Sequence, residues 1–130
     1  KTNLDALHQL HALGVKIALD DFGTGFSALS YLLSYPFDKI KADGSFVRAI
    51  DNASGAQTIV RAIADIGHGL GIVTTAEGIE TPAQLRKVHA AGYTEAQGFL
   101  ISRPIPAHMV HEMLQGEDDR MPVAPLQKSA

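Results

Sequence analysis

The feature that most constrains the fold is a fourfold alternation of short β-rich segments with longer helical segments. Strands are predicted at residues 15–19, 38–42, 71–76 and 95–96. Helices are predicted after them, at residues 28–33, 56–68, 82–91 and 107–114. The strand segments are apolar rather than alternating, as in sheets buried on both faces, and the helices are long enough to serve as crossovers between parallel strands. The pattern predicts an α/β fold with a parallel sheet and alternating helices.

The two ends of the chain and one internal segment have their own signals. Leucines recur at every third position from Leu4 to Leu13, and Gly14 follows where a helix-ending glycine is expected. An opening helix is therefore predicted before the first strand. Residues 45–54 lack periodicity and are predicted to form a loop. The polar residues 115–130 are predicted to form a flexible tail after a structured unit spanning residues 1–114.

The two long internal helices carry further signals. Thr81 is a predicted N-cap, because Pro82 then takes the first helical position, where proline is favoured. The earlier helix is predicted to bury one apolar face, made of Ile59, Ile63, Ile66 and Leu70.

Composition excludes several classes of function. The 130 residues contain no cysteine, which excludes disulfide scaffolds, thiolate zinc sites and cysteine nucleophiles. The net charge is −3, so no basic surface for a nucleic-acid polymer is expected. No apolar run approaches the length of a membrane span, and the first residues resemble neither a signal peptide nor an anchor. A cytoplasmic domain is expected.

Polar side chains follow each predicted strand at its carboxyl end. They are Asp20 and Asp21, Lys41 with Asp43, Glu77, and Gln97. Parallel α/β folds build their sites at this edge of the sheet. Several carboxylates gathered there are costly to bury without a partner, and a divalent cation with oxygen ligands offsets that cost. The set predicts metal-assisted displacement at phosphorus.

The adjacent pair Asp20 and Asp21 leaves two interpretations open. Neighbours in a regular strand point to opposite faces, so both can reach one site only if the backbone turns where the strand ends. Gly23 and Gly25 favour such a turn. Alternatively, one aspartate caps the loop and the other faces solvent.

Two other families share part of this pattern. The stretch Asp21-Phe22-Gly23 matches the magnesium motif of protein kinases, but the His-Arg-Asp loop that should precede it is missing. A receiver-like domain would also use an acidic pair, yet its lysine should end the last strand, whereas Lys41 ends the second predicted strand. The pairs His8/His11 and His108/His111 lack a carboxylate partner at ligand spacing and are interpreted as surface residues.

Four motifs, in order, resemble those of EAL domains, the bacterial cyclic di-GMP phosphodiesterases. They are ALDDFGTGFS at 18–27, KADGSFV at 41–47, TAEGIET at 75–81 and QGFLISRP at 97–104. The resemblance covers residues 4–114. It implies that the chain is the C-terminal half of a (β/α)8 TIM-type barrel.

The resemblance also implies a chemistry and a set of roles. EAL domains use two Mg²⁺ or Mn²⁺ ions and an activated water to open cyclic di-GMP to linear pGpG. By position in the motifs, Asp20 and Asp21 resemble metal ligands, and Glu77 a further metal-site carboxylate with a catalytic role. Lys41 resembles the residue that holds the attacking water, with Asp43 in the same network, and Gln97 resembles a ligand contact. The mobile regulatory loop of the family corresponds to Phe22, Gly23, Thr24, Gly25, Phe26 and Ser27.

The sequence also departs from the family pattern. Ala42, Gly44 and Phe26 stand where the family usually has isoleucine, a larger polar residue and tyrosine. The Glu-Ala-Leu signature and the upstream asparagine and glutamate ligands are absent from the chain. We therefore expect the parent protein to be a phosphodiesterase and the isolated chain to be inactive. The alternative is a truncated or degenerate module that binds cyclic di-GMP or a protein. Open sheet edges predict a homo-oligomer or pairing with an N-terminal half.

Overall fold

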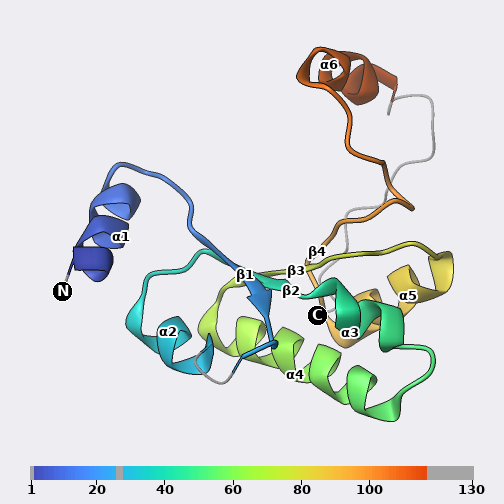
Figure 1. Ribbon diagram of the computed structural model, residues 1–130, viewed down its shortest axis with the longest axis horizontal. Helices are drawn as coiled ribbons and strands as arrows, with labels where there is room; N and C mark the ends of the chain where they lie inside the picture. The colour runs from blue at the N-terminus through green and yellow to red at the C-terminus, as the bar shows by residue number, and fades with distance from the viewer. Residues whose placement is uncertain (1, 26–27, 117–130) are drawn as a thin grey trace.

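Four parallel strands form one sheet, in the order β1-β2-β3-β4 (Figure 1). The computed structural model describes residues 2–25 and 28–116. The strands are β1 (Ala18–Phe22), β2 (Lys39–Ala42), β3 (Val73–Ala76) and β4 (Glu95–Ala96). Each pairs in parallel with the next one along the chain. The predicted α/β class and parallel sheet are therefore confirmed.

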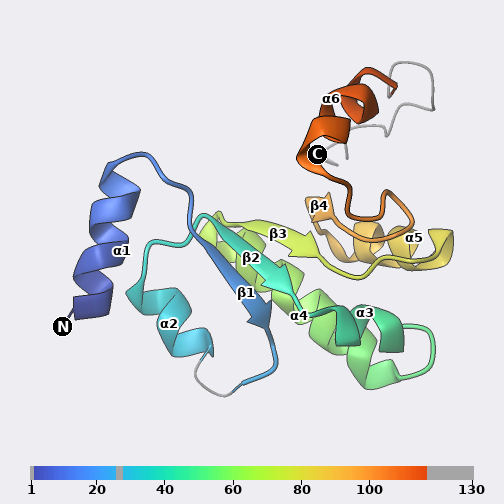
Figure 2. The same ribbon diagram turned by 45° about the horizontal axis from the view of Figure 1, so that its top comes forward.

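Six helices accompany the sheet in the described residues, and they differ in how closely they lie to it. They are α1 (Thr2–Ala12), α2 (Ala28–Ser34), α3 (Gly44–Ala49), α4 (Ser54–Leu70), α5 (Pro82–Ala91) and α6 (Ala107–Gly116). Helix α4 packs against β2 and β3, and it also contacts α3 and α5. Helices α1 and α6 stand away from the sheet in both views (Figures 1 and 2).

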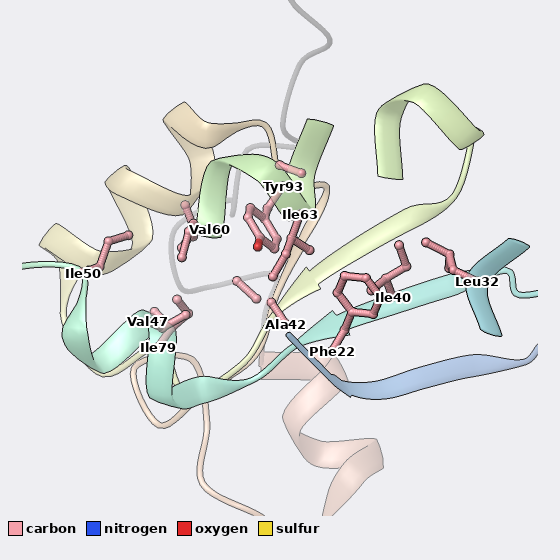
Figure 3. Close-up of a cluster of buried hydrophobic side chains, with 13 residues drawn as sticks. Phe22, Leu32, Ile40, Ala42, Val47, Ile50, Val60, Ile63, Ile79 and Tyr93 are labelled. Atoms are coloured by element: carbon pink, nitrogen blue, oxygen red, sulfur yellow. The ribbon is translucent and has the colours of Figure 1, made fainter. Parts of the chain in front are cut away.

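The main core lies between the sheet and α4. Ile40 and Ala42 of β2 are fully buried in it, together with Val60 and Ile63 of α4 (Figure 3). Because side chains alternate along a strand, Lys39 and Lys41 project from the opposite face. That face is polar and partly exposed, whereas the apolar runs in the sequence predicted strands buried on both faces.

Strand β1 lies three residues later than predicted. The sequence placed it at 15–19, but pairing with β2 begins at Ala18 and continues to Phe22. Its last residue, Phe22, is buried in the main core, and this burial holds the end of the strand against the sheet. Residues 15–17, which precede β1, are held by a side chain rather than by strand pairing with β2. The Asp38 carboxylate accepts a hydrogen bond from the Ile17 backbone N–H at 2.9 Å.

The predicted loop at 45–54 is wrong, because α3 occupies Gly44–Ala49 and α4 begins at Ser54. Asp43 caps α3, since its side chain accepts a hydrogen bond from the Ser45 backbone N–H. Val47 anchors the helix in the core.

The buried stripe of α4 also differs from the prediction. Ile63 is buried as expected, but Ile59 and Leu70 are exposed. The buried residues of α4 are mainly small: Ala56, Val60, Ile63, Ala64 and Gly67. Small side chains at this spacing let the helix approach β3 closely.

The ends of α5 agree with the prediction. The Thr81 hydroxyl accepts from the Gln84 backbone, and the Gln84 side chain accepts from the Thr81 backbone, which makes a capping box. Gly92 ends the helix with a φ of 99°.

Two remaining predictions concern residues at the limits of the described ranges. Gln115 and Gly116 belong to α6 rather than to the predicted tail, and residues 117–130 lie outside the described residues. Phe26 and Ser27, the last two residues of the predicted regulatory loop, also lie outside them. Within the described ranges, no helix has the length and apolarity that crossing a membrane requires.

Candidate functional site

The two adjacent aspartates owe their arrangement to a local distortion at the end of β1. The pairing register shifts between Leu19 and Phe22, and Asp21 adopts a left-handed backbone with φ 52°. The Asp21 backbone N–H donates to the Asp20 carboxylate at 2.9 Å. A bulge of this kind re-aims a side chain that a regular strand would point to the other face. The turn that the sequence required for both carboxylates to share a site is therefore present.

Three carboxylates meet at the carboxyl edge of the sheet. Oxygen atoms of Asp20, Asp21 and Glu77 all lie within 4.8 Å of one another. Glu77 follows β3 directly, and its backbone N–H donates to Ala42 at the end of β2. Both aspartates contribute an oxygen to this cluster. Both are also exposed, and Asp20 accepts from the Asp21 backbone as a loop cap would, so the choice between a shared site and the alternative interpretation stays a prediction.

Lys41 of β2 binds this carboxylate cluster from the side. Its Nζ lies 2.5 Å from Glu77 Oε1 and 3.9 Å from Asp20 Oδ1. The hydrogen bond to Glu77 raises the pKa of Lys41 above its usual value, so the ammonium stays charged. Lys41 and Glu77 side chains are about one-fifth exposed, whereas Asp20 is mostly exposed. The cluster therefore combines three carboxylates with one cation at a solvent-accessible edge.

Asp43 lies beside the cluster rather than in it. Its carboxylate accepts from the Ser45 backbone at 2.8 Å, and its hydrogen bonds with Ser45 lower the pKa of Asp43. The Asp21 carboxyl group and Arg48 also favour its charged form. The clearest role that these contacts give Asp43 is to begin α3 next to the site.

Gln97 follows β4 at the same edge of the sheet. Its backbone N–H donates to Ala76 at 2.9 Å, and its carbonyl accepts from Ile79 at 3.1 Å. Its side chain is exposed, which leaves it available to a ligand. Gly98 lies directly against the Ile79 backbone, where a Cβ has no room. This close approach explains the glycine after Gln97.

The predicted regulatory loop begins inside the core. Phe22 is buried as the last residue of β1. Gly23 has φ 103°, and a Cβ there would come within 2.6 Å of the Phe46 ring. The Thr24 hydroxyl donates to the Asp21 carbonyl at 2.8 Å, which closes the turn, and Gly25 is exposed. The role of this segment as a mobile loop stays a prediction.

Sequence reasoning missed a second group of polar residues on the same face of the sheet. Lys39 Nζ lies 2.5 Å from Glu95 Oε2, and the Thr75 hydroxyl donates to the same oxygen at 2.8 Å. We call Lys39, Thr75 and Glu95 the lower tier, since each precedes a predicted site residue by two positions. Spacing by two on one strand places side chains on one face, and this was the signal available in the sequence.

The donor set of the carboxylate cluster suits a divalent cation. Its three carboxylates offer only oxygen atoms, which hard ions such as Mg²⁺ and Mn²⁺ prefer. Three negative charges against the single charge of Lys41 leave a net attraction for a cation.

Comparison with known proteins identifies the family. The family model described as EAL domain matches residues 1–104. The chain belongs to the EAL domain family. A signalling protein of Caulobacter vibrioides is 52% identical over 103 residues, and a protein of Sinorhizobium fredii is 47% identical over 118. These alignments cover 79% and 91% of this chain but only 13% and 14% of those relatives, so the chain spans about one-seventh of their length.

Solved EAL structures are similar over most of the chain. The EAL domain of Mycobacterium smegmatis DcpA has a TM-score of 0.84 at 40% identity, covering 93% of this chain and 53% of that one. The PaMucR phosphodiesterase in complex with c-di-GMP has a TM-score of 0.78 at 42% identity, covering 82% and 43%. Klebsiella pneumoniae BlrP1, in a complex with manganese and c-di-GMP, has a TM-score of 0.72 at 41% identity, covering 77% and 26%. The parallel sheet of this EAL chain is therefore a fragment of a TIM-type barrel.

Proposed function

We propose that this EAL chain is part of a phosphodiesterase that hydrolyses cyclic di-GMP to linear pGpG with Mg²⁺ or Mn²⁺. The observation that carries the proposal is the carboxylate cluster with Lys41 bound to it. Similar EAL structures hold c-di-GMP, and one of them holds manganese with it, which supports both the substrate and the metal.

Each residue of the site has a distinct part in this proposal. Asp20, Asp21 and Glu77 hold the cations. Bound divalent ions supply Lewis-acid stabilisation of phosphate charge and lower the pKa of water. Lys41 directs its ammonium to the attacking water and limits repulsion within the cluster.

The remaining predicted residues lie around this centre. Asp43 supports it by capping α3 and by standing next to Asp21. Gln97 contacts the cyclic dinucleotide from the end of β4. Gly23, Thr24 and Gly25 follow the buried Phe22 and form the described part of the regulatory loop beside the aspartates. Phe26 and Ser27, the rest of this predicted loop, lie outside the described residues.

The proposal is tested by incubating cyclic di-GMP with Mg²⁺ or Mn²⁺ and separating the products by chromatography. Three catalysts are compared: this chain alone, a complete EAL domain, and a chimera in which residues 1–104 replace the matched part of DcpA. We expect pGpG from the complete domain and from the chimera, and none from the isolated chain.

Variants of the chimera decide the residue roles. Glu77→Gln and Lys41→Met should each abolish hydrolysis. Glu80→Gln and Lys87→Met are matched controls, because neither residue belongs to the carboxylate cluster, and they should keep full activity. A folded chimera that binds cyclic di-GMP without forming pGpG would instead support a receptor or interaction module.

A further inference from the structure

The lower tier lies directly beneath the carboxylate cluster on the open face of the sheet. In the sheet register Lys41 pairs with Thr75, and Thr75 pairs with Glu95, so these three form one row across β2, β3 and β4. The backbone of Lys39 pairs with Val73, two residues before the Lys41–Thr75 pair. Its side chain nevertheless extends across β3, and the ammonium binds Glu95 of β4. Thr75 is covered by this arrangement and is only 4% exposed.

Without Glu95, Lys39 would lose its ion-pair partner, and the three carboxylates of the cluster lie further along the same face of the sheet. Lys39 lies on the same strand face as Lys41, about 7 Å below it along the strand. It also pairs with Ala18, and Asp20 is two residues further along β1. A lysine side chain is long enough to span this diagonal. Glu95 and the carboxylate cluster are therefore alternative ion-pair partners for the Lys39 ammonium.

We propose that Glu95 holds the ammonium of Lys39 away from Asp20, Asp21 and Glu77, so that this cluster stays open to a divalent cation. The inference rests on the proposed metal site and assigns Glu95 and Lys39 as positioning residues for it. The hydroxyl of Thr75 fixes the Glu95 carboxylate in place.

The charge state of the pair supports this role. The hydrogen bond from Lys39, with a second one from Thr75, lowers the pKa of Glu95. Glu95 is therefore ionised at neutral pH, and the lower tier carries no net charge. The carboxylate cluster keeps its single internal cation, Lys41, rather than gaining a second one that would oppose metal binding.

The test is Mn²⁺ titration of the 130-residue chain by calorimetry at low salt, for the unchanged protein and three variants. Glu95→Gln keeps the acceptor for Thr75 but frees Lys39, and it should weaken Mn²⁺ binding about three- to tenfold. Lys39→Met leaves the negative Glu95 below the site and should tighten binding by roughly the same factor. The double variant should return to within about twofold of the unchanged protein, and all differences should shrink in 0.5 M salt.

The opposite signs separate this role from a merely structural one. Loss of a structural tie would lower the melting temperature and weaken Mn²⁺ binding in both single variants. Asp51→Asn and Lys87→Met remove a comparable exposed ion pair elsewhere and should leave the affinity unchanged. Should Glu95→Gln not fold, Lys39→Met carries the same test alone.

Each outcome decides between the two proposals. Unchanged or weaker Mn²⁺ binding by Lys39→Met, or unchanged binding by a folded Glu95→Gln, would overturn the positioning role and leave the metal site standing. No binding of Mn²⁺ by the unchanged chain would overturn the metal site of the proposed function, and this inference with it.

Discussion

Two glycines in α4, two residues apart, should respond to the same substitution with opposite signs. Gly67 faces β3, and a Cβ there would fall on the Thr74 methyl group and within 3.2 Å of the Ile72 carbonyl. Gly69 lies on the exposed side, with nothing within 4 Å of the added Cβ. Gly67→Ala therefore tests how closely α4 must approach the strand that positions Glu77.

The magnitudes follow from packing and helix propensity. Alanine gains about 0.5–1 kcal/mol over glycine inside a helix, so Gly69→Ala should stabilise by up to that amount. Overpacking a core costs about 1–3 kcal/mol. Thr74 is buried and its χ1 rotamers are restricted, so its methyl group cannot move far from an added Cβ. After the propensity gain, Gly67→Ala should destabilise the chain by about 1–2 kcal/mol.

A compensating double variant isolates the steric contact. Thr74→Ser removes the methyl group and should cost about 1 kcal/mol by itself. Combined with Gly67→Ala, it should recover at least about 1 kcal/mol relative to the sum of the single changes. Urea denaturation followed by circular dichroism measures all four proteins, with equal m-values as the check on two-state behaviour. A stabilising Gly67→Ala, or a double variant that is strictly additive, would refute the close approach of α4 to β3.

Three further predictions concern the core, the bulge and the lower tier. Tyr93→Phe should be neutral or stabilising by up to about 1 kcal/mol in urea denaturation, because the buried hydroxyl has no hydrogen-bond partner among the described residues; a loss above 1 kcal/mol would contradict this. Asp21→Asn should keep the stability of the chain while Asp21→Ala loses about 1 kcal/mol, because asparagine tolerates the left-handed backbone; equal stability of the two variants would argue against the strained bulge. The pKa of Glu95 is lowered by Lys39, so its contribution is present above the usual carboxyl pKa and lost as pH falls through the lowered value. In Glu95→Gln, the free energy of unfolding should therefore fall less steeply with decreasing pH in the acid range, by less than about 1 kcal/mol because the ion pair is partly exposed. An acid-range pH dependence equal to that of the unchanged protein would contradict this prediction.

The parts of the fold that depend on local signals could be predicted from the sequence. The capping box at Thr81 and the glycine at Gly92 set both ends of α5 through bonds within a few residues. The short α3 could not be predicted in the same way, because glycine at its start opposes helix formation. Its stability depends on the Asp43 cap and on burial of Val47, and burial is a property of the assembled core.

For the candidate site, the residues could be predicted from the sequence, but most of the contacts between them could not. Repetition of polar residues after each strand predicted that Asp20, Asp21, Lys41 and Glu77 would meet at one edge. The contacts between them depend on register and on the bulge at Asp21, which single-residue propensities do not specify. The lower tier was missed because Lys39 reaches two strands across the sheet, a pairing that spans 56 residues of sequence.

The central claim is that Asp20, Asp21 and Glu77 hold a divalent cation. Anomalous diffraction from crystals of this chain grown with Mn²⁺ tests it most directly. The account predicts an anomalous peak within about 2.5 Å of oxygens from all three carboxylates, and its loss in Glu77→Gln. A fully ordered cluster with Lys41 still bound to Glu77 and no peak beside it, at saturating Mn²⁺, would contradict the account.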